Sequence, residues 1–149
     1  MIRKKAIIIS LIVVLTSCGF TPIYLKNDNI NFSIEQVNLT GDRELNNFLK
    51  TNFSRYKNKN IDTKIFIEAK SKYNKIILSK DGSGEVTNYQ LEAEVIFLIK
   101  PTNKQILLSE KKIMESMSDK FEENKFEKFT KQNFASSITY KLISELIIN

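Results

Sequence analysis

One residue in this sequence stands apart chemically, the lone cysteine Cys18. The thiolate of a cysteine is a nucleophile, and it can accept a diacylglyceryl group under mild conditions. The sequence has no second cysteine with which Cys18 could form a disulfide. A buried structural cysteine is the alternative interpretation. The position of Cys18, just after an apolar run near the N-terminus, favours modification of the thiol.

The residues before Cys18 have the layout of a secretory signal peptide. Arg3, Lys4 and Lys5 form a positively charged start, and an apolar run follows over residues 6–15. A helix needs roughly 20 apolar residues to cross a bilayer, and this run is about half as long. We therefore expect residues 1–17 to be a cleaved leader rather than a membrane-spanning anchor.

The motif Leu15-Thr16-Ser17-Cys18 resembles the lipobox of bacterial lipoproteins. The resemblance implies that the mature chain begins at Cys18 and carries an N-acyl group and an S-diacylglycerol group there, palmitate among them. Several acyl chains hold a protein stably on a membrane, at about 0.8 kcal/mol for each buried CH₂. The next residue is Gly19 rather than the aspartate that retains such proteins at the inner membrane. We therefore expect the outer membrane, on its periplasmic side, as the location.

The rest of the composition excludes several functions. The chain has no histidine, so a Ser-His-Asp triad, a Cys-His pair and the usual zinc ligand sets are absent from the sequence. Acidic pairs such as Glu122 and Glu123 lie in charged stretches and are interpreted as solvated surface. We expect no enzyme, no metal site and no cofactor. Removal of the leader lowers the formal net charge from +6 to about +3, which together with export argues against nucleic acid as a partner.

The elements that would position any site follow from the hydrophobic periodicity of residues 30–149, which are enough for one domain. Residues 18–29 are expected to be a lipidated tether. Apolar residues alternate from Ile30 to Ile34 and then change phase, which predicts a strand with a bulge or an early end. Asp42 is the expected N-cap of a helix. That helix has one apolar stripe, formed by Leu45, Phe48, Leu49, Phe53 and Tyr56.

Two alternating runs around a Gly-rich turn predict a long β-hairpin. Its strands cover residues 64–78 and 88–99, and its turn covers residues 80–84. A fourth strand is expected from about Gln105 to Met117, where it pairs with the strand before it.

A charged loop from Asp119 to Lys125 is expected to lead into a long final helix that begins at Phe126. Both Phe126 and Phe129 are assigned to the core rather than to a docking patch for a partner. The order strand, helix, three strands, helix predicts an α+β fold. We expect a two-layer sandwich with about four mostly antiparallel strands covered by two helices.

The residues that follow the expected cleavage site resemble a known family. Residues 18–24 read Cys-Gly-Phe-Thr-Pro-Ile-Tyr, which resembles the mature N-terminus Cys-Gly-Phe-x-Pro-Leu-Tyr of the LptE family of lipopolysaccharide-assembly lipoproteins. Residues 84–91 resemble the hairpin turn of that family and its Tyr-x-Leu strand. The order of elements is also similar, so residues 30–149 are expected to form an LptE-like α+β domain.

The resemblance implies a structural and chaperone-like role rather than catalysis. LptE-like proteins sit as a plug inside the outer-membrane β-barrel LptD, help that barrel to assemble and help to deliver lipopolysaccharide to the outer leaflet. A rival interpretation is an accessory periplasmic lipoprotein of another envelope complex, such as a lipid-exporting transporter. A lipid-anchored hydrolase is disfavoured by the missing histidine.

Four lysines are candidates for lipopolysaccharide binding. Lys75 and Lys80 lie towards the hairpin tip, where an ammonium group can meet a lipid A phosphate as a point charge. The LptE resemblance implies basic glycolipid-binding residues near that hairpin, matched best by Lys80, and before the last helix, matched best by Lys120 or Lys125. A solvated lysine without this role is the alternative at each position. We expect charge reversal at both Lys75 and Lys80 to weaken glycolipid binding without unfolding the domain.

Overall fold

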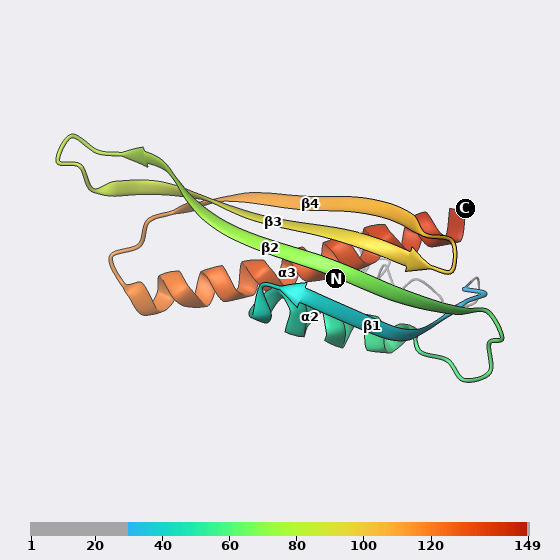
Figure 1. Cartoon of the computed structure of the whole chain (residues 1–149). Coiled ribbons are helices and arrows are strands. Elements are labelled where there is room, and N and C mark those ends of the chain that lie inside the picture. The colour runs from blue at the N-terminus through green and yellow to red at the C-terminus, as the bar shows by residue number, and fades with distance from the viewer. Residues whose placement is uncertain (1–29, 149) are drawn as a thin grey trace, which may run out of the picture.

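A computed structural model of the chain describes residues 30–148, so Cys18, the leader and the tether lie outside the described residues. The described chain forms a mixed four-stranded sheet in the order β1-β2-β3-β4, with two helices packed on one of its faces (Figure 1). This architecture confirms the predicted α+β sandwich. The elements are β1 (Ser33–Gly41), α2 (Arg43–Phe53), the short 3-10 helix η2 (Ser54–Tyr56), β2 (Lys64–Lys80), β3 (Val86–Lys100), β4 (Lys104–Glu115) and α3 (Lys120–Ile148).

The first strand and the helix after it are confirmed, although β1 begins at Ser33 rather than Ile30 and Tyr56 lies in η2 rather than in α2. β1 runs parallel to β2, whereas β3 is antiparallel to both of its neighbours. The crossover from β1 to β2 passes through α2, whose N-cap is Asp42: its Oδ1 accepts a hydrogen bond of 2.7 Å from the N–H of Leu45. The change of phase in β1 is a bulge, since the register shifts between Ile34 and Gln36. Because of the bulge, Ile34 and Val37 both pack against the core despite their odd spacing.

The core lies between the sheet and the helices and is centred on β3. Phe97 of β3 meets Phe53 of α2 edge to face, with the ring centroids 6.0 Å apart. The second half of α3 supplies the other large apolar side chains, including Ile138 and Leu142, which are fully buried. Alternate side chains of β3 face the helices and are at most 3 % exposed: Leu91, Ala93, Val95, Phe97 and Ile99.

The final helix begins earlier than predicted, so the expected charged loop is wrong. α3 starts at Lys120 and not at Phe126. Asp119 caps it, because its Oδ1 accepts hydrogen bonds from the N–H groups of Phe121 and Glu122 at 2.8 and 3.4 Å. Acidic side chains in the first turn also suit the positive end of the helix dipole. The charges of this segment therefore belong to the first turns of a helix. No helix within residues 30–148 is long and apolar enough to span a membrane.

The first half of α3 also departs from its predicted apolar stripe. Phe129, expected in the core, is 57 % exposed, whereas the polar Thr130 beside it is buried. Phe126 is partly buried, and the ammonium group of Lys112 lies 4.8 Å from its ring centroid. Because α2 does not extend to this end of α3 (Figure 1), only one side of the helix is covered here. The prediction of a core role is therefore wrong for Phe129 and confirmed only in part for Phe126.

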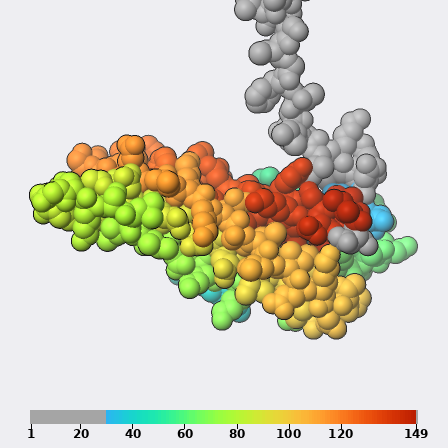
Figure 2. Space-filling model, turned by 90° about the horizontal axis from the view of Figure 1, so that it is seen from above, coloured from blue at the N-terminus to red at the C-terminus, as the bar shows by residue number. Residues whose placement is uncertain are grey.

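The β2–β3 hairpin extends beyond the rest of the sheet. β1 pairs with β2 only as far as Gly41 opposite Ser71, and β4 pairs with β3 as far as Glu115 opposite Asn88, slightly short of the predicted strand end. The hairpin tip lies at one end of an elongated molecule (Figures 1 and 2), and the start of α3 lies beneath the tip half of the hairpin (Figure 1). Within the described part of the chain, the first turns of α3 are the only helical cover for this part of the hairpin.

Gly41 allows a test of the close approach between β1 and β2. Its φ is +103°, and an added Cβ would collide with the backbone oxygen of Ser71. We expect Gly41→Ala to lower the free energy of unfolding by about 3 kcal/mol, because it adds backbone strain and a clash with main chain. Urea unfolding followed by circular dichroism measures the change.

The matched control is Gly82→Ala. Nothing lies within 4 Å of a Cβ added to Gly82, so the free energy of unfolding should change by no more than about 0.5 kcal/mol. Equal effects of the two substitutions would contradict the close approach of the strands at Gly41.

Candidate functional site

The four candidate lysines lie along the hairpin and at the start of α3. Lys75 lies within β2 and Lys80 is its last residue, while Lys120 begins α3 and Lys125 follows in the next turn. The structure brings two of them together, because Lys75 and Lys120 both form ion pairs with Glu123. Lys80 and Lys125 are exposed and take no part in this cluster. Cys18, the expected lipidation site, lies outside the described residues.

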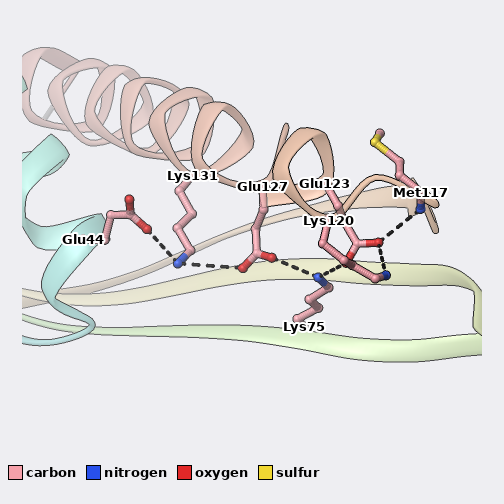
Figure 3. A network of polar contacts seen from close by, with 7 residues as sticks. All are labelled: Glu44, Lys75, Met117, Lys120, Glu123, Glu127 and Lys131. Atoms are coloured by element: carbon pink, nitrogen blue, oxygen red, sulfur yellow. Dashed lines mark hydrogen bonds and ion pairs between the residues drawn. The ribbon is translucent and has the colours of Figure 1, made fainter. Parts of the chain in front are cut away.

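Glu123 is a buried carboxylate with three donors. Its Oε1 accepts a hydrogen bond from Lys75 Nζ at 2.9 Å, and its Oε2 accepts from Lys120 Nζ at 3.0 Å and from the backbone N–H of Met117 at 3.1 Å (Figure 3). The hydrogen bond from Lys75 is the largest cause that lowers the pKa of Glu123, to about 2. Burial acts in the opposite sense, and the Met117 N–H and Lys120 lower the pKa further. The residue is 4 % exposed, so the prediction that Glu123 is solvated surface is wrong.

Glu123 belongs to an ion network that crosses three elements (Figure 3). Lys75 also donates to Oε2 of Glu127 at 3.1 Å. Lys131 Nζ lies 3.8 Å from Oε1 of Glu127 and 3.0 Å from Oε2 of Glu44. Carboxylates and ammonium groups four residues apart in α3 share one face of the helix, so they line up towards β2 and α2. Six residues therefore form this ion network: Glu44, Lys75, Lys120, Glu123, Glu127 and Lys131.

Two tyrosines give the lysines of the ion network a second kind of contact. The Lys75 ammonium group lies 4.4 Å from the ring centroid of Tyr89, and that of Lys131 lies 4.2 Å from Tyr73. Burial opposes the charge of Lys75, but its two carboxylate partners outweigh burial and raise its pKa. Burial and then the nearby Glu127 carboxylate raise the pKa of Tyr73, so its phenol stays neutral. Lys75 is therefore a permanent cation with two carboxylates and an aromatic ring as partners.

An open hollow of about 740 Å³ lies beside the ion network, between the tip of the hairpin, the end of β4 and the start of α3. Lys120 and Met117, two of the donors to Glu123, line it together with Tyr89. Such a hollow can bind and orient a polar ligand through charge-assisted hydrogen bonds. No cluster of histidine, cysteine or acidic side chains within residues 30–148 could hold a metal ion. The wall of the hollow also carries three carboxylates, those of Asp81, Glu85 and Glu115.

Sequence reasoning identified two cationic donors of this site and missed their acceptors. The alternation in β2 places Lys75 on the same face as Ala69 and Tyr73, which pack towards the helices. A lysine that points into a core needs a carboxylate partner. The acidic residues spaced at one helical turn, Glu123 and Glu127, are the partners that such reasoning would have supplied.

The fold is shared with solved bacterial lipoproteins. Neither a protein-family model nor a curated protein sequence matches the chain. Rare lipoprotein B of Shewanella oneidensis has a similar structure, with a TM-score of 0.54, 15 % identity and coverage of 75 % of this chain and 96 % of its own. An uncharacterized lipoprotein B of Nitrosomonas europaea gives a TM-score of 0.51 at 16 % identity, covering 76 % and 83 %. A minor lipoprotein of Acinetobacter baumannii gives 0.51 at 12 % identity, covering 74 % and 93 %. At these identities the similarity establishes the fold alone.

The contribution of Glu123 to stability should depend on pH. Its pKa is lower in the folded chain than the usual value of 4.5, so its stabilising effect is fully present above about pH 5 and is lost as the pH falls towards 2. We expect Glu123→Gln to lower the free energy of unfolding by about 2 kcal/mol at pH 7, because two ammonium groups lose a charged acceptor. Denaturant unfolding of the variant and the wild type at pH 7, 4 and 2.5 measures this difference, which should shrink with falling pH.

The control is Glu122→Gln in the same turn. Glu122 is half exposed and pairs only with the exposed Lys125, so its substitution should cost no more than about 0.5 kcal/mol at any pH. A pH-independent difference between the wild type and Glu123→Gln would show that the charge of Glu123 does not stabilise the fold.

Proposed function

We propose that this chain is an outer-membrane lipoprotein, anchored through lipid on Cys18 on the periplasmic side, that acts as a plug and assembly factor of the LptD barrel in lipopolysaccharide transport. The observation that supports this most is the coincidence of two independent features. Residues 18–24 carry the lipobox cysteine and the LptE-like motif, and the described chain has the fold of known bacterial lipoproteins.

The shape and surface of the domain suit the inside of a barrel. β2 has 17 residues and so extends over about 55 Å, while the sandwich is only two layers thick. The lumen of a wide barrel is polar, and a plug needs a surface of mixed charge to match it. The sheet face that no helix covers has such a surface. Lys72 lies opposite Glu94 there, and Lys111 forms an ion pair of 3.0 Å with Glu92.

The same face also presents apolar side chains that a partner would cover. Leu107 and Ile113 of β4 are 59 % and 64 % exposed, and Phe66 of β2 is 41 % exposed. Exposed large apolar residues on one face are typical of a surface that binds another protein. We therefore assign this sheet face, rather than the helical layer, to contact with the barrel wall.

For the glycolipid, the structure separates the four candidate lysines into two kinds. Lys80, Lys120 and Lys125 are exposed and their ammonium groups can reach a phosphate. Lys75 is committed to Glu123 and Glu127, and reversal of its charge would place a third carboxylate against these two. The expectation that Lys75 can be reversed without loss of stability is therefore withdrawn, and Lys80 is the residue to vary at the tip.

A photo-crosslinking amino acid at Ile113 in the full-length chain tests the proposed partner. After irradiation of intact cells, we expect recovery of one large outer-membrane β-barrel, because Ile113 lies on the face assigned to the barrel wall. The same amino acid at Leu91, which is fully buried, is the control and should give no crosslink to another protein.

The same experiment decides between the two candidate functions. Recovery of only an inner-membrane ATPase complex would contradict the plug and favour the accessory subunit of a lipid-exporting transporter. Recovery of the barrel from a Cys18→Ala chain that stays unlipidated would show that the anchor is not needed for docking.

A further inference from the structure

We infer that Glu123 is a built-in competitor for the ligand of this site: its carboxylate occupies the place of a phosphate ester, and a phosphorylated glycolipid binds by displacing it. The identity of the ligand rests on the proposed function. The arrangement of donors around Glu123 is independent of that function.

The first argument is the donor set. Two ammonium groups and one backbone N–H converge on a single carboxylate, at 2.9, 3.0 and 3.1 Å. The same three donors suit a phosphate, which offers more acceptor oxygens and at least as much negative charge. The site also lies at the start of α3, where the helix dipole favours an anion. Glu123 satisfies these donors when no ligand is bound.

The second argument is access. Lys120 and Met117 line the hollow of about 740 Å³, and Tyr89, which contacts the third donor Lys75, lines it as well. The side chain of Lys120 is 67 % exposed although that of Glu123 is only 5 % exposed. A phosphate that enters the hollow therefore meets the exposed Lys120 first, and the half-buried Met117 and Lys75 next. Three acidic side chains also line the hollow, those of Asp81, Glu85 and Glu115, and each opposes an anion close to it.

The third argument is that Glu123 can leave at little cost to the core. It lies in the first turn of α3, and the neighbouring Phe121 and Glu122 are exposed. The apolar core around β3 is built on the second half of α3, from Phe134 onwards. Departure of this carboxylate frees Lys120 and the Met117 N–H, leaves Lys75 with Glu127 as its remaining carboxylate partner, and leaves the apolar core in place.

A purely structural ion pair and a competitor make opposite predictions for ligand binding. If Glu123 only stabilises the fold, Glu123→Gln should bind ligand no better than the wild type. If Glu123 competes, the same substitution should improve binding, because the neutral amide is a weaker acceptor for two ammonium groups. Lys75→Gln should weaken binding in either background.

The test uses the full-length lipidated chain in nanodiscs of zwitterionic lipid, with labelled diphosphorylated lipid A as the probe. We expect Glu123→Gln to bind the probe roughly fivefold more tightly than the wild type or better. The gain should disappear in the Glu123→Gln, Lys75→Gln double variant and with dephosphorylated lipid A. Lys128→Gln, at an exposed position of α3 outside the ion network, is the matched control and should not alter the gain.

Circular dichroism confirms that each variant is folded. If Glu123→Gln does not fold, Glu123→Asp takes its place. Aspartate keeps the charge but withdraws the carboxylate by one methylene, so this variant should give a smaller gain in probe binding, of the same sign. Unchanged or weaker binding by the folded variant would overturn the inference. An equal gain with inorganic phosphate as the probe would overturn the assignment to a glycolipid. Neither result affects the crosslink to a barrel, so failure of this inference is distinguishable from failure of the proposed function.

Discussion

The contact on which the hairpin end of the molecule depends is the one between Glu123 and its three donors. Near β1 and α2, the helices pack on the sheet through fully buried apolar side chains. Beyond Ser71 the hairpin has lost β1 as a neighbour, and within residues 30–148 only the first turns of α3 lie beneath it. There the ion network acts together with buried apolar side chains such as Leu91 and Met114. A buried carboxylate with its donors satisfied fixes the position of a helix, because removal of either partner leaves an unpaired charge.

Much of the fold could be predicted because its signals are local. The alternation in residues 64–78 and 88–99 and the turn between them specify the hairpin, and Asp42 specifies the start of α2. The start of α3 was misplaced because a dense run of charges resembles a solvated loop, although Asp119 and the acidic residues after it are also helix-start signals. Phe129 was misplaced because helical spacing alone does not tell how far the neighbouring α2 reaches.

The candidate site was harder to predict than the fold, because it depends on contacts between residues distant in sequence. Lys75 and Glu123 are 48 positions apart, and nothing local to either one shows that they meet. In the sequence Lys75 and Lys80 are equivalent lysines near the hairpin tip. In the structure Lys75 is partly buried and bound to two carboxylates, whereas Lys80 is exposed. Burial and partner, rather than residue type, decide which cations are free to bind a ligand. The apolar core near β1 and the ion network at the hairpin suit a domain that keeps its shape while its hairpin end binds a ligand.

Hydrogen exchange of the full-length chain, followed by mass spectrometry, tests most directly whether Glu123 fixes the start of α3 to the hairpin. In Glu123→Gln, the amides of residues 124–128 should exchange roughly tenfold faster than in the wild type, while those of β3 remain unchanged. Unchanged exchange in residues 124–128, or an equal increase in β3, would contradict the account. Unchanged exchange would mean that other contacts hold the start of α3. An equal increase in β3 would mean that Glu123 stabilises the whole fold rather than the contact between α3 and the hairpin.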